Sequence, residues 1–200
     1  MNRIKMLGLA VIATGALLGL IGVGSASAEL CSTNTSPCTG TVYPNGTTLH
    51  MTLKAGSKVD LNTNLGTLTC TSGTIKGKTT SHIFHKDTVD IESLVNASCT
   101  LGGSACTVTA TGLSTESEIN ATGGGNGTMT IGSMGMKWEC GVFLNCTFTA
   151  PKGLLSFTGG NPANVTAKEV EMSRSGGFCP SSAKWNAEYE VTSPKPVFEI

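Results

Sequence analysis

The chain has 200 residues, equal numbers of acidic and basic side chains, and only 13% charged residues. Without a basic stripe to hold phosphates, nucleic acid is excluded as an expected partner. The length suits one ordinary domain with a sizeable hydrophobic core.

The N-terminus has the pattern of a secretory signal peptide. Two basic residues precede an apolar run over Met6–Val23. Ala26-Ser27-Ala28 follows the run and has the small-x-small pattern of a signal-peptidase site. We predict cleavage between Ala28 and Glu29, so that residues 1–28 are a leader and residues 29–200 form a single secreted β domain. We expect no transmembrane segment after cleavage, and a protein that is secreted, extracellular or associated with the cell surface.

Eight cysteines follow the predicted cleavage site, and an even number in an exported chain predicts a disulfide framework. A metal site built from cysteines is disfavoured because the sequence has no C-x-x-C pair. Local spacing and, for the last bond, elimination predict the pairs Cys31–Cys38, Cys99–Cys106, Cys140–Cys146 and Cys70–Cys179.

Short segments of alternating polarity begin after an N-terminal arm. Thr48–Leu53 alternates threonine or histidine with leucine or methionine, which predicts a half-buried strand. Two more short strands are expected around Lys58–Leu61 and Gly66–Ser72. The charged stretch Thr79–Asp90 is interpreted as a loop or edge strand that leads into a strand over Val89–Ser98.

Three hairpins follow along the chain. The first turns at Leu101–Ser104, with Cys99 and Cys106 on its two sides. The second spans Glu116–Ser133 and turns at the sequence GGGNG, whose glycines supply the positive φ angles of a tight turn. The third is Lys137–Ala150, in which two cysteines flank a short bend.

The last strands are predicted at Gly153–Thr158, Val165–Ser173 and Ala183–Thr192. The alternation within Val165–Ser173 changes phase near Lys168, which a β-bulge explains. Ala183–Thr192 is the most regular amphipathic strand, and a proline-punctuated tail ends in Phe198 and Ile200, which we expect to dock on the protein's own sheet.

These segments together predict an all-β protein. The glycines and β-branched threonines are spread evenly, and the short strands recur at the spacing that is typical of sandwiches and barrels. We predict a disulfide-stapled antiparallel β-sandwich of jelly-roll or immunoglobulin-like type, with an irregular β-barrel as the alternative.

The strongest metal candidates are His82, His85 and Asp87, with Asp90 nearby. Residues three apart on a strand face opposite sides, so both imidazoles reach one ion only if this stretch is a loop. The expectation is therefore a solvated loop with no bound metal and no cofactor.

No catalytic residue is predicted. The sequence lacks a G-x-S-x-G motif, and its candidates for a glycosidase pair are Glu116, Glu118, Glu139, Glu169 and Glu171, whereas Glu188 and Glu190 lie on the polar face of a strand and are expected at the solvated surface. A secreted hydrolase with a site assembled from distant loops stays open as one alternative. A secreted inhibitor that uses a protruding loop at Gly141–Asn145 is another.

Four segments resemble a large group of secreted bacterial β proteins with paired cysteines: CTVTATGL at Cys106–Leu113, INATGGGNGTMTI at Ile119–Ile131, NCTFTAP at Asn145–Pro151 and GGFCPSSAKWNAEYEVTSPKP at Gly176–Pro196. The layout of leader, G-x-L-x-C strand, S-x-C-T and terminal cysteine strand is also similar to secreted proteins described as activators of alkane oxidation. These resemblances imply a secreted β fold and an extracellular surface-active or matrix role, and they carry over no catalytic residues.

The expected function is thus that of a non-enzymatic β module with an envelope, matrix or adhesive role. Its expected partners are cell-envelope or matrix components, or further copies of itself.

Overall fold

The computed structural model describes residues 29–83, 86–113, 116–142, 144–176 and 179–200. The predicted leader, including Ala28 at the predicted cleavage site, therefore lies outside the described residues. His85 also lies outside them. Within the part of the chain that the structure describes, no helix has the length and hydrophobicity needed to cross a bilayer.

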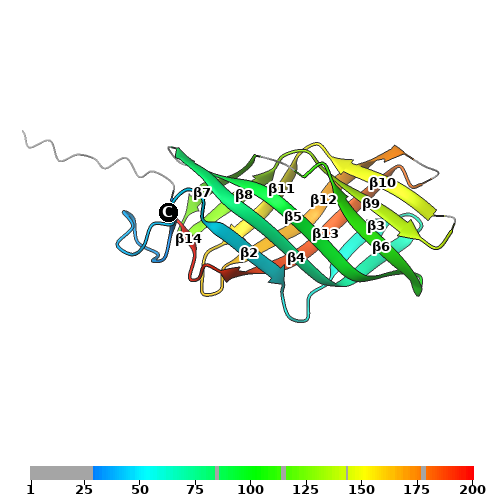
Figure 1. Ribbon diagram of the computed structural model, residues 1–200, viewed down its shortest axis with the longest axis horizontal. Coiled ribbons are helices and arrows are strands. Elements are labelled where there is room, and N and C mark those ends of the chain that lie inside the picture. The colour runs from blue at the N-terminus through cyan, green and yellow to red at the C-terminus, as the bar shows by residue number, and fades with distance from the viewer. Residues whose placement is uncertain (1–28, 84–85, 114–115, 143, 177–178) are drawn as a thin grey trace, which may run out of the picture.

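The described residues form antiparallel strands, as the alternating sequence pattern predicts (Figure 1). The strands are β1 (Leu30–Cys31), β2 (Thr48–Leu53), β3 (Val59–Thr63), β4 (Gly66–Ile83), β5 (Lys86–Leu101), β6 (Ser104–Thr111), β7 (Ser117–Gly123), β8 (Asn126–Ile131), β9 (Met134–Cys140), β10 (Leu144–Ala150), β11 (Gly153–Thr158), β12 (Asn164–Gly176), β13 (Ser182–Ser193) and β14 (Phe198–Glu199).

Twelve of these strands, β2 to β13, belong to one sheet whose hydrogen-bonded pairings form a closed circuit. The long strands β4 and β5 pair along their length, and so do β12 and β13. At one end of the molecule β7, β8 and β11 connect β5 to β12, and β2 connects β13 to β4. At the other end β6, β9 and β10 connect β5 to β12, and β3 connects β13 to β4.

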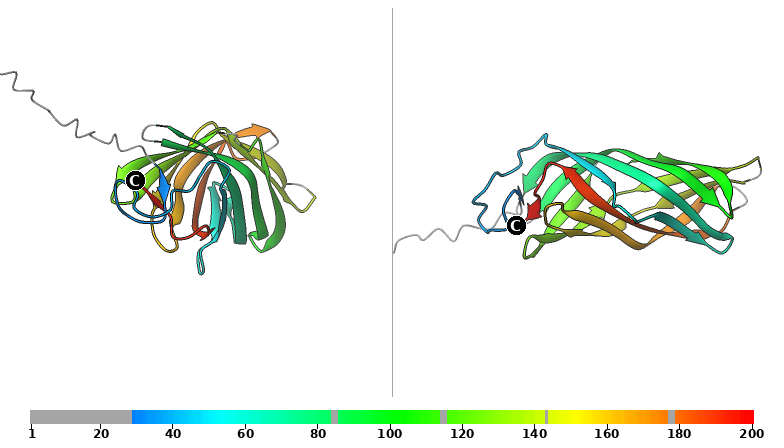
Figure 2. Two further views of the ribbon diagram at one scale, coloured as in Figure 1. Left: turned by 60° about the vertical axis from the view of Figure 1, so that its left-hand side comes forward. Right: turned by 90° about the horizontal axis from the view of Figure 1, so that it is seen from below.

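The all-β prediction is confirmed. The circuit of pairings returns to its first strand, and this closed circuit of β2 to β13 is called the barrel below. Figure 2 shows the strands surrounding a common interior. A closed sheet leaves few unpaired strand edges.

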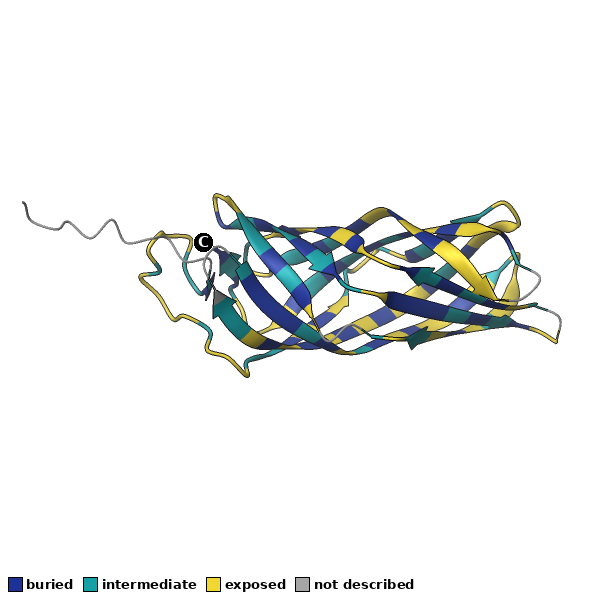
Figure 3. Ribbon diagram, turned by 90° about the horizontal axis from the view of Figure 1, so that it is seen from above, coloured by how far each residue is buried: buried dark blue, intermediate teal, exposed yellow. Residues whose placement is uncertain are grey.

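The core lies inside this closed sheet. Buried and exposed residues alternate along the strands (Figure 3), and β13 shows this most regularly. Its inward residues include Trp185 and Tyr189, both with no exposed surface, and Trp138 and Phe148 pack with ring centroids 4.5 Å apart. Large aromatic side chains therefore fill the half of the barrel that holds β9 and β10.

Most predicted strands and turns are present, with two differences. The GGGNG hairpin and the bulge near Lys168 are confirmed, since the β12 register shifts between Ala167 and Val170. Thr79–Asp90, predicted as a loop or edge strand, holds the end of β4 and the start of β5, which pair from Thr79 opposite Val89 to Ile83 opposite Lys86; residues 84 and 85 lie outside the described part of the chain. Gly66–Ser72 is only the first part of β4, which continues past Gly73 to Ile83.

The disulfides differ from the predicted set in three of four cases. Cys31–Cys38 is confirmed. The predicted pairs Cys99–Cys106, Cys140–Cys146 and Cys70–Cys179 are wrong, because the structure bonds Cys70 to Cys99, Cys106 to Cys140 and Cys146 to Cys179.

The physical reason is the strand register. Cys140 lies opposite Leu144, and Cys146 lies opposite Trp138, so the two cysteines of this hairpin are not partners. Cys99 does lie opposite Cys106, but an interior strand has two neighbours, and on its other side Cys99 lies opposite Cys70. Sequence spacing shows only the local neighbour.

Candidate functional site

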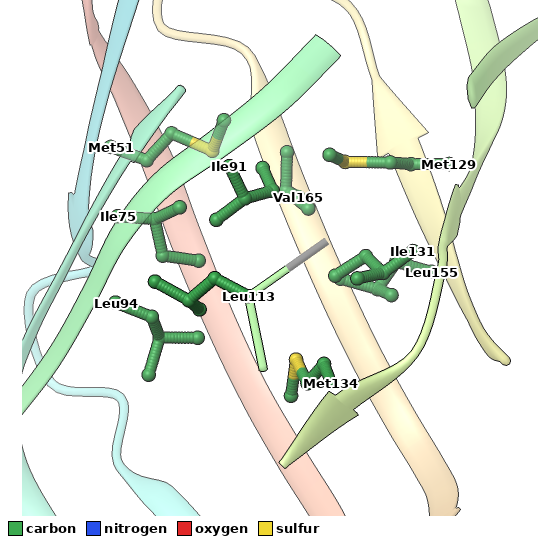
Figure 4. A pocket seen from close by; sticks show the side chains of 10 residues that line it. All are labelled: Met51, Ile75, Ile91, Leu94, Leu113, Met129, Ile131, Met134, Leu155 and Val165. Atoms are coloured by element: carbon green, nitrogen blue, oxygen red, sulfur yellow. The ribbon is translucent and has the colours of Figure 1, made fainter. Parts of the chain in front are cut away.

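The interior of the barrel has little free space. Four long strands and four short ones surround the interior at each end, so eight strands enclose it at either end. Closed sheets of this size either fill their interior with side chains or hold one small ligand there. In this protein ten apolar residues surround a cavity of ≈ 10 Å³, which is about the space of one water molecule (Figure 4). Met51, Met129 and Met134 are among them, and the lining offers no polar partner to a water molecule. The interior is therefore packed core and not a ligand chamber.

Buried carboxyl groups lie instead at one end of the barrel, where the described N- and C-terminal residues pair. We call Glu29–Cys31 together with Phe198–Ile200 the terminal clasp. Leu30 lies opposite Glu199, and the Glu29 amide donates to the Ile200 carbonyl at 3.0 Å. The backbone amide of Glu199 donates to the Gly125 carbonyl at 3.0 Å. The clasp thereby ties β1 to β14 and β14 to the β7–β8 turn.

Asp87 connects the clasp to the β4–β5 hairpin. One carboxylate oxygen accepts a hydrogen bond from the Leu30 amide at 2.7 Å, and the other lies 2.5 Å from Nδ1 of His82. Burial raises the pKa of Asp87, an effect that the hydrogen bond from His82 opposes. Through its two oxygens, this fully buried carboxyl group therefore links the clasp to His82 on β4.

The structure thus brings two of the three predicted metal candidates, His82 and Asp87, into contact. They meet because β4 and β5 are paired strands with these two residues in register, and not because the segment is a loop. Among the described residues, no group of three histidine, cysteine, aspartate or glutamate side chains could hold a metal ion.

Glu199 is a second buried carboxyl group of the clasp, and the sequence analysis missed it. Its side chain is fully buried, and neither carboxylate oxygen has a hydrogen-bond partner among the described residues. Burial, together with the nearby Asp87 and Glu29, raises the pKa of Glu199 to about 9. The available sequence signal is period 2: Glu199 shares a side with the buried Val197, whereas Phe198 and Ile200 face the other way.

The glutamates considered for glycoside hydrolysis have a different environment. Lysines lie within ion-pair distance of three of these partly exposed candidates, at 2.6 Å from Glu118, 2.8 Å from Glu139 and 2.7 Å from Glu169. A lysine also lies 2.5 Å from Glu188 on β13. The hydrogen bond from Lys184 lowers the pKa of Glu169. A glycosidase general acid needs a raised pKa, so these pairs are typical of a solvated outer surface.

The β9–β10 turn, the predicted inhibitor loop at Gly141–Asn145, projects from the opposite end of the barrel. Val142 is 88% exposed. The cysteines that flank the turn bond outward, Cys140 to Cys106 and Cys146 to Cys179, so both strands that carry the turn are anchored to other parts of the barrel. Phe143 lies outside the described residues.

A shallow groove of ≈ 340 Å³ lies beside the clasp, between the N-terminal arm and the β7–β8 turn. Asn34, Ser36 and Ile200 line it together with the turn glycines, and the Asn34 amide donates to the Gly124 carbonyl at 3.1 Å. These lining residues are uncharged, and none of them is a nucleophile paired with a base.

No family model, no curated protein and no solved structure matches the chain. The resemblance to secreted bacterial β proteins therefore stays a prediction, and function is inferred from the chain's own residues.

Proposed function

We propose that the protein is a secreted or cell-surface-associated, non-enzymatic β module that binds partners through its outer surface. The observation that carries this proposal is the disulfide framework: the structure leaves no free cysteine among the described residues. Four disulfides are typical of extracellular proteins, because reducing compartments keep thiols free.

The packed interior supports binding on the outside. A carrier that encloses its ligand needs a chamber, whereas this barrel is filled by side chains such as Trp185 and Tyr189. The outer face of the sheet consists largely of threonine, serine and asparagine, as along β6 and β10. Such a surface suits contact with envelope or matrix polymers, or with further copies of the chain.

The β9–β10 turn is the best-supported contact point on that surface. Val142, at 88%, is the most exposed large apolar side chain among the described residues, and the two disulfides beside it limit the entropy that its strands would lose on binding. The same observation favours the secreted inhibitor as the second candidate, since an inhibitor also presents a rigid protruding loop.

Fractionation of the source organism tests the location. Culture supernatant, cell wall, membrane and cytoplasm are separated with free thiols blocked, and peptides are mapped by mass spectrometry without reduction. We expect the oxidised chain, beginning at Glu29, in the supernatant or cell-wall fraction. A reduced chain in the cytoplasm would contradict the proposal.

Binding is tested with the purified oxidised protein and washed cell envelopes from the same organism, by co-sedimentation. Val142→Ser should weaken binding severalfold, whereas Leu154→Ser, which alters a 62% exposed residue on β11, should leave it unchanged. Equal binding by the two variants would remove the β9–β10 turn from the proposal. Inhibition of a secreted hydrolase that is lost in Val142→Ser would favour the inhibitor.

A further inference from the structure

The Glu199 carboxyl group lacks a partner in a place where a partner is needed. Burying a carboxyl group without hydrogen bonds is unfavourable whether the group is charged or neutral. The charged groups that act on it, Glu29 and Asp87, are both acidic. His82 faces Asp87 through Nδ1, and its Nε2 is buried without a partner. The terminal clasp therefore concentrates negative charge around a carboxyl group that has no cation among the described residues.

The backbone nitrogen of Glu29 lies at the edge of this acidic site. It is 3.0 Å from the Ile200 carbonyl oxygen, and the next nitrogen, that of Leu30, is 2.7 Å from a carboxylate oxygen of Asp87. Consecutive backbone nitrogens are at most about 3.7 Å apart, so the Glu29 nitrogen is within roughly 6 Å of that oxygen. Leu30 lies directly opposite Glu199.

We propose that the terminal clasp is a binding site for the α-ammonium group of Glu29, which cleavage of the Ala28–Glu29 bond creates. This inference rests on the proposed removal of the leader. Hydrolysis by a separate peptidase adds one water molecule, leaves the new carboxylate on Ala28 and leaves the new amine on Glu29. The amine takes up a proton at neutral pH, because an α-amino group has a pKa of about 7.7 to 8.0.

Cleavage changes what this nitrogen can do. As an amide it carries no charge and donates one hydrogen bond, which Ile200 accepts. As an ammonium it carries a positive charge and three donors, so it keeps the bond to Ile200 and directs the other two toward Asp87 and Glu199. Charge-assisted hydrogen bonds of this kind are stronger than neutral ones. The processed chain is therefore more stable than a chain extended or blocked at Glu29.

The pH dependence has a definite sign. The acidic site raises the pKa of the α-amino group above its ordinary value, so the stabilisation is fully present below about pH 7.7. It is lost as the pH rises through the higher pKa of the folded state. The charged and titratable groups that face the amine are Glu29 itself, Asp87 on β5, Glu199 on β14 and, through Asp87, His82 on β4. In a chain that ends at Ile200 they include the terminal α-carboxylate, whose oxygen accepts the hydrogen bond from the Glu29 nitrogen.

The test compares two oxidised forms of residues 29–200, which contain every described strand and disulfide. One has a free amine on Glu29 and the other is acetylated there, and each is made with Glu199 and with Glu199→Gln. With Glu199 present, we expect acetylation to lower the Tm by about 5 °C. In the Glu199→Gln pair the difference should shrink. In the free form, NMR titration should give an α-amino pKa at least one unit above the ordinary value.

Two outcomes would overturn the inference. One is an ordinary α-amino pKa together with equal Tm values for the free and acetylated forms. The other is an equal rise in the Tm of both forms on adding Ca²⁺, which would make the clasp a metal site. The NMR titration stands even if Glu199→Gln fails to fold. Because the N-terminus is set chemically, a negative result leaves the proposed extracellular role untouched.

Discussion

Four cysteines occupy one row across the inner face of four adjacent strands. Cys70 on β4, Cys99 on β5, Cys106 on β6 and Cys140 on β9 are successive register partners, and the disulfides join the first to the second and the third to the fourth. The two central cysteines of this cysteine row also lie opposite each other. We predict that Cys70→Ala leaves a Cys99 thiol that exchanges with the Cys106–Cys140 disulfide.

Loss of Cys70–Cys99, with a sequence separation of 29, destabilises the fold by about 3.6 kcal/mol in the chain-entropy treatment. Exchange replaces the Cys106–Cys140 loop, with a separation of 34, by a loop as short as that of Cys31–Cys38, with a separation of 7. The shorter loop constrains the unfolded chain less, so the exchanged form is less stable to unfolding by about 1.4 kcal/mol. Because this difference lies in the unfolded state, loop length favours neither disulfide among folded molecules, and both free thiols should be present.

The assay is thiol alkylation of the folded Cys70→Ala variant at pH 8, followed by acid quench and peptide mapping without reduction. We expect label on both Cys99 and Cys140, which report the two positions of the remaining disulfide. Cys38→Ala is the matched control, because its free thiol on Cys31 lies at the clasp end, away from the cysteine row. Label on Cys99 alone, or equal label on Cys146, would refute the reasoning.

Three further predictions concern stability. Trp185→Ala should lower the free energy of unfolding by about 3 to 5 kcal/mol in urea denaturation, and Val142→Ser, at an exposed site, by less than about 0.5 kcal/mol. Gly135→Ala should destabilise the fold by about 1 to 3 kcal/mol, because its Cβ would overlap the Thr111 hydroxyl. Gly176→Ala, with open space around it, is the control. Equal Tm values for the two variants would contradict the close approach. In the form acetylated at residue 29, stability should fall as the pH rises from about 4.5 towards 9, by at most about 1.4 kcal/mol per unit, since the unfolded chain releases the Glu199 proton first. Glu199→Gln should flatten that part of a Tm-against-pH profile.

Local patterns predicted most of the strands because alternation is a property of neighbouring residues. Ala183–Thr192 alternates without interruption and is β13, and the phase change near Lys168 is a bulge in β12. The stretch Thr79–Asp90 gives no clear strand signal, because its charged and polar residues resemble a loop. In the structure Asp87 is buried there, held by His82 and the Leu30 amide.

The candidate site was only half visible in the sequence. His82 and Asp87 could be singled out because their side chains carry recognisable chemistry at close spacing. Glu199 gave little warning, since its burial depends on the pairing of β14 with β1, between segments at opposite ends of the described chain.

By itself the sequence determined the strand class, the hairpin turns and the even cysteine count, because each depends on local spacing or on composition. Only the tertiary structure decided how the sheet closes, which cysteines are partners and which carboxyl group is buried without a partner. These depend on strand register between distant segments. A shift of one residue in register would move every side chain of a strand to the other face, and local patterns do not specify that choice across the whole barrel.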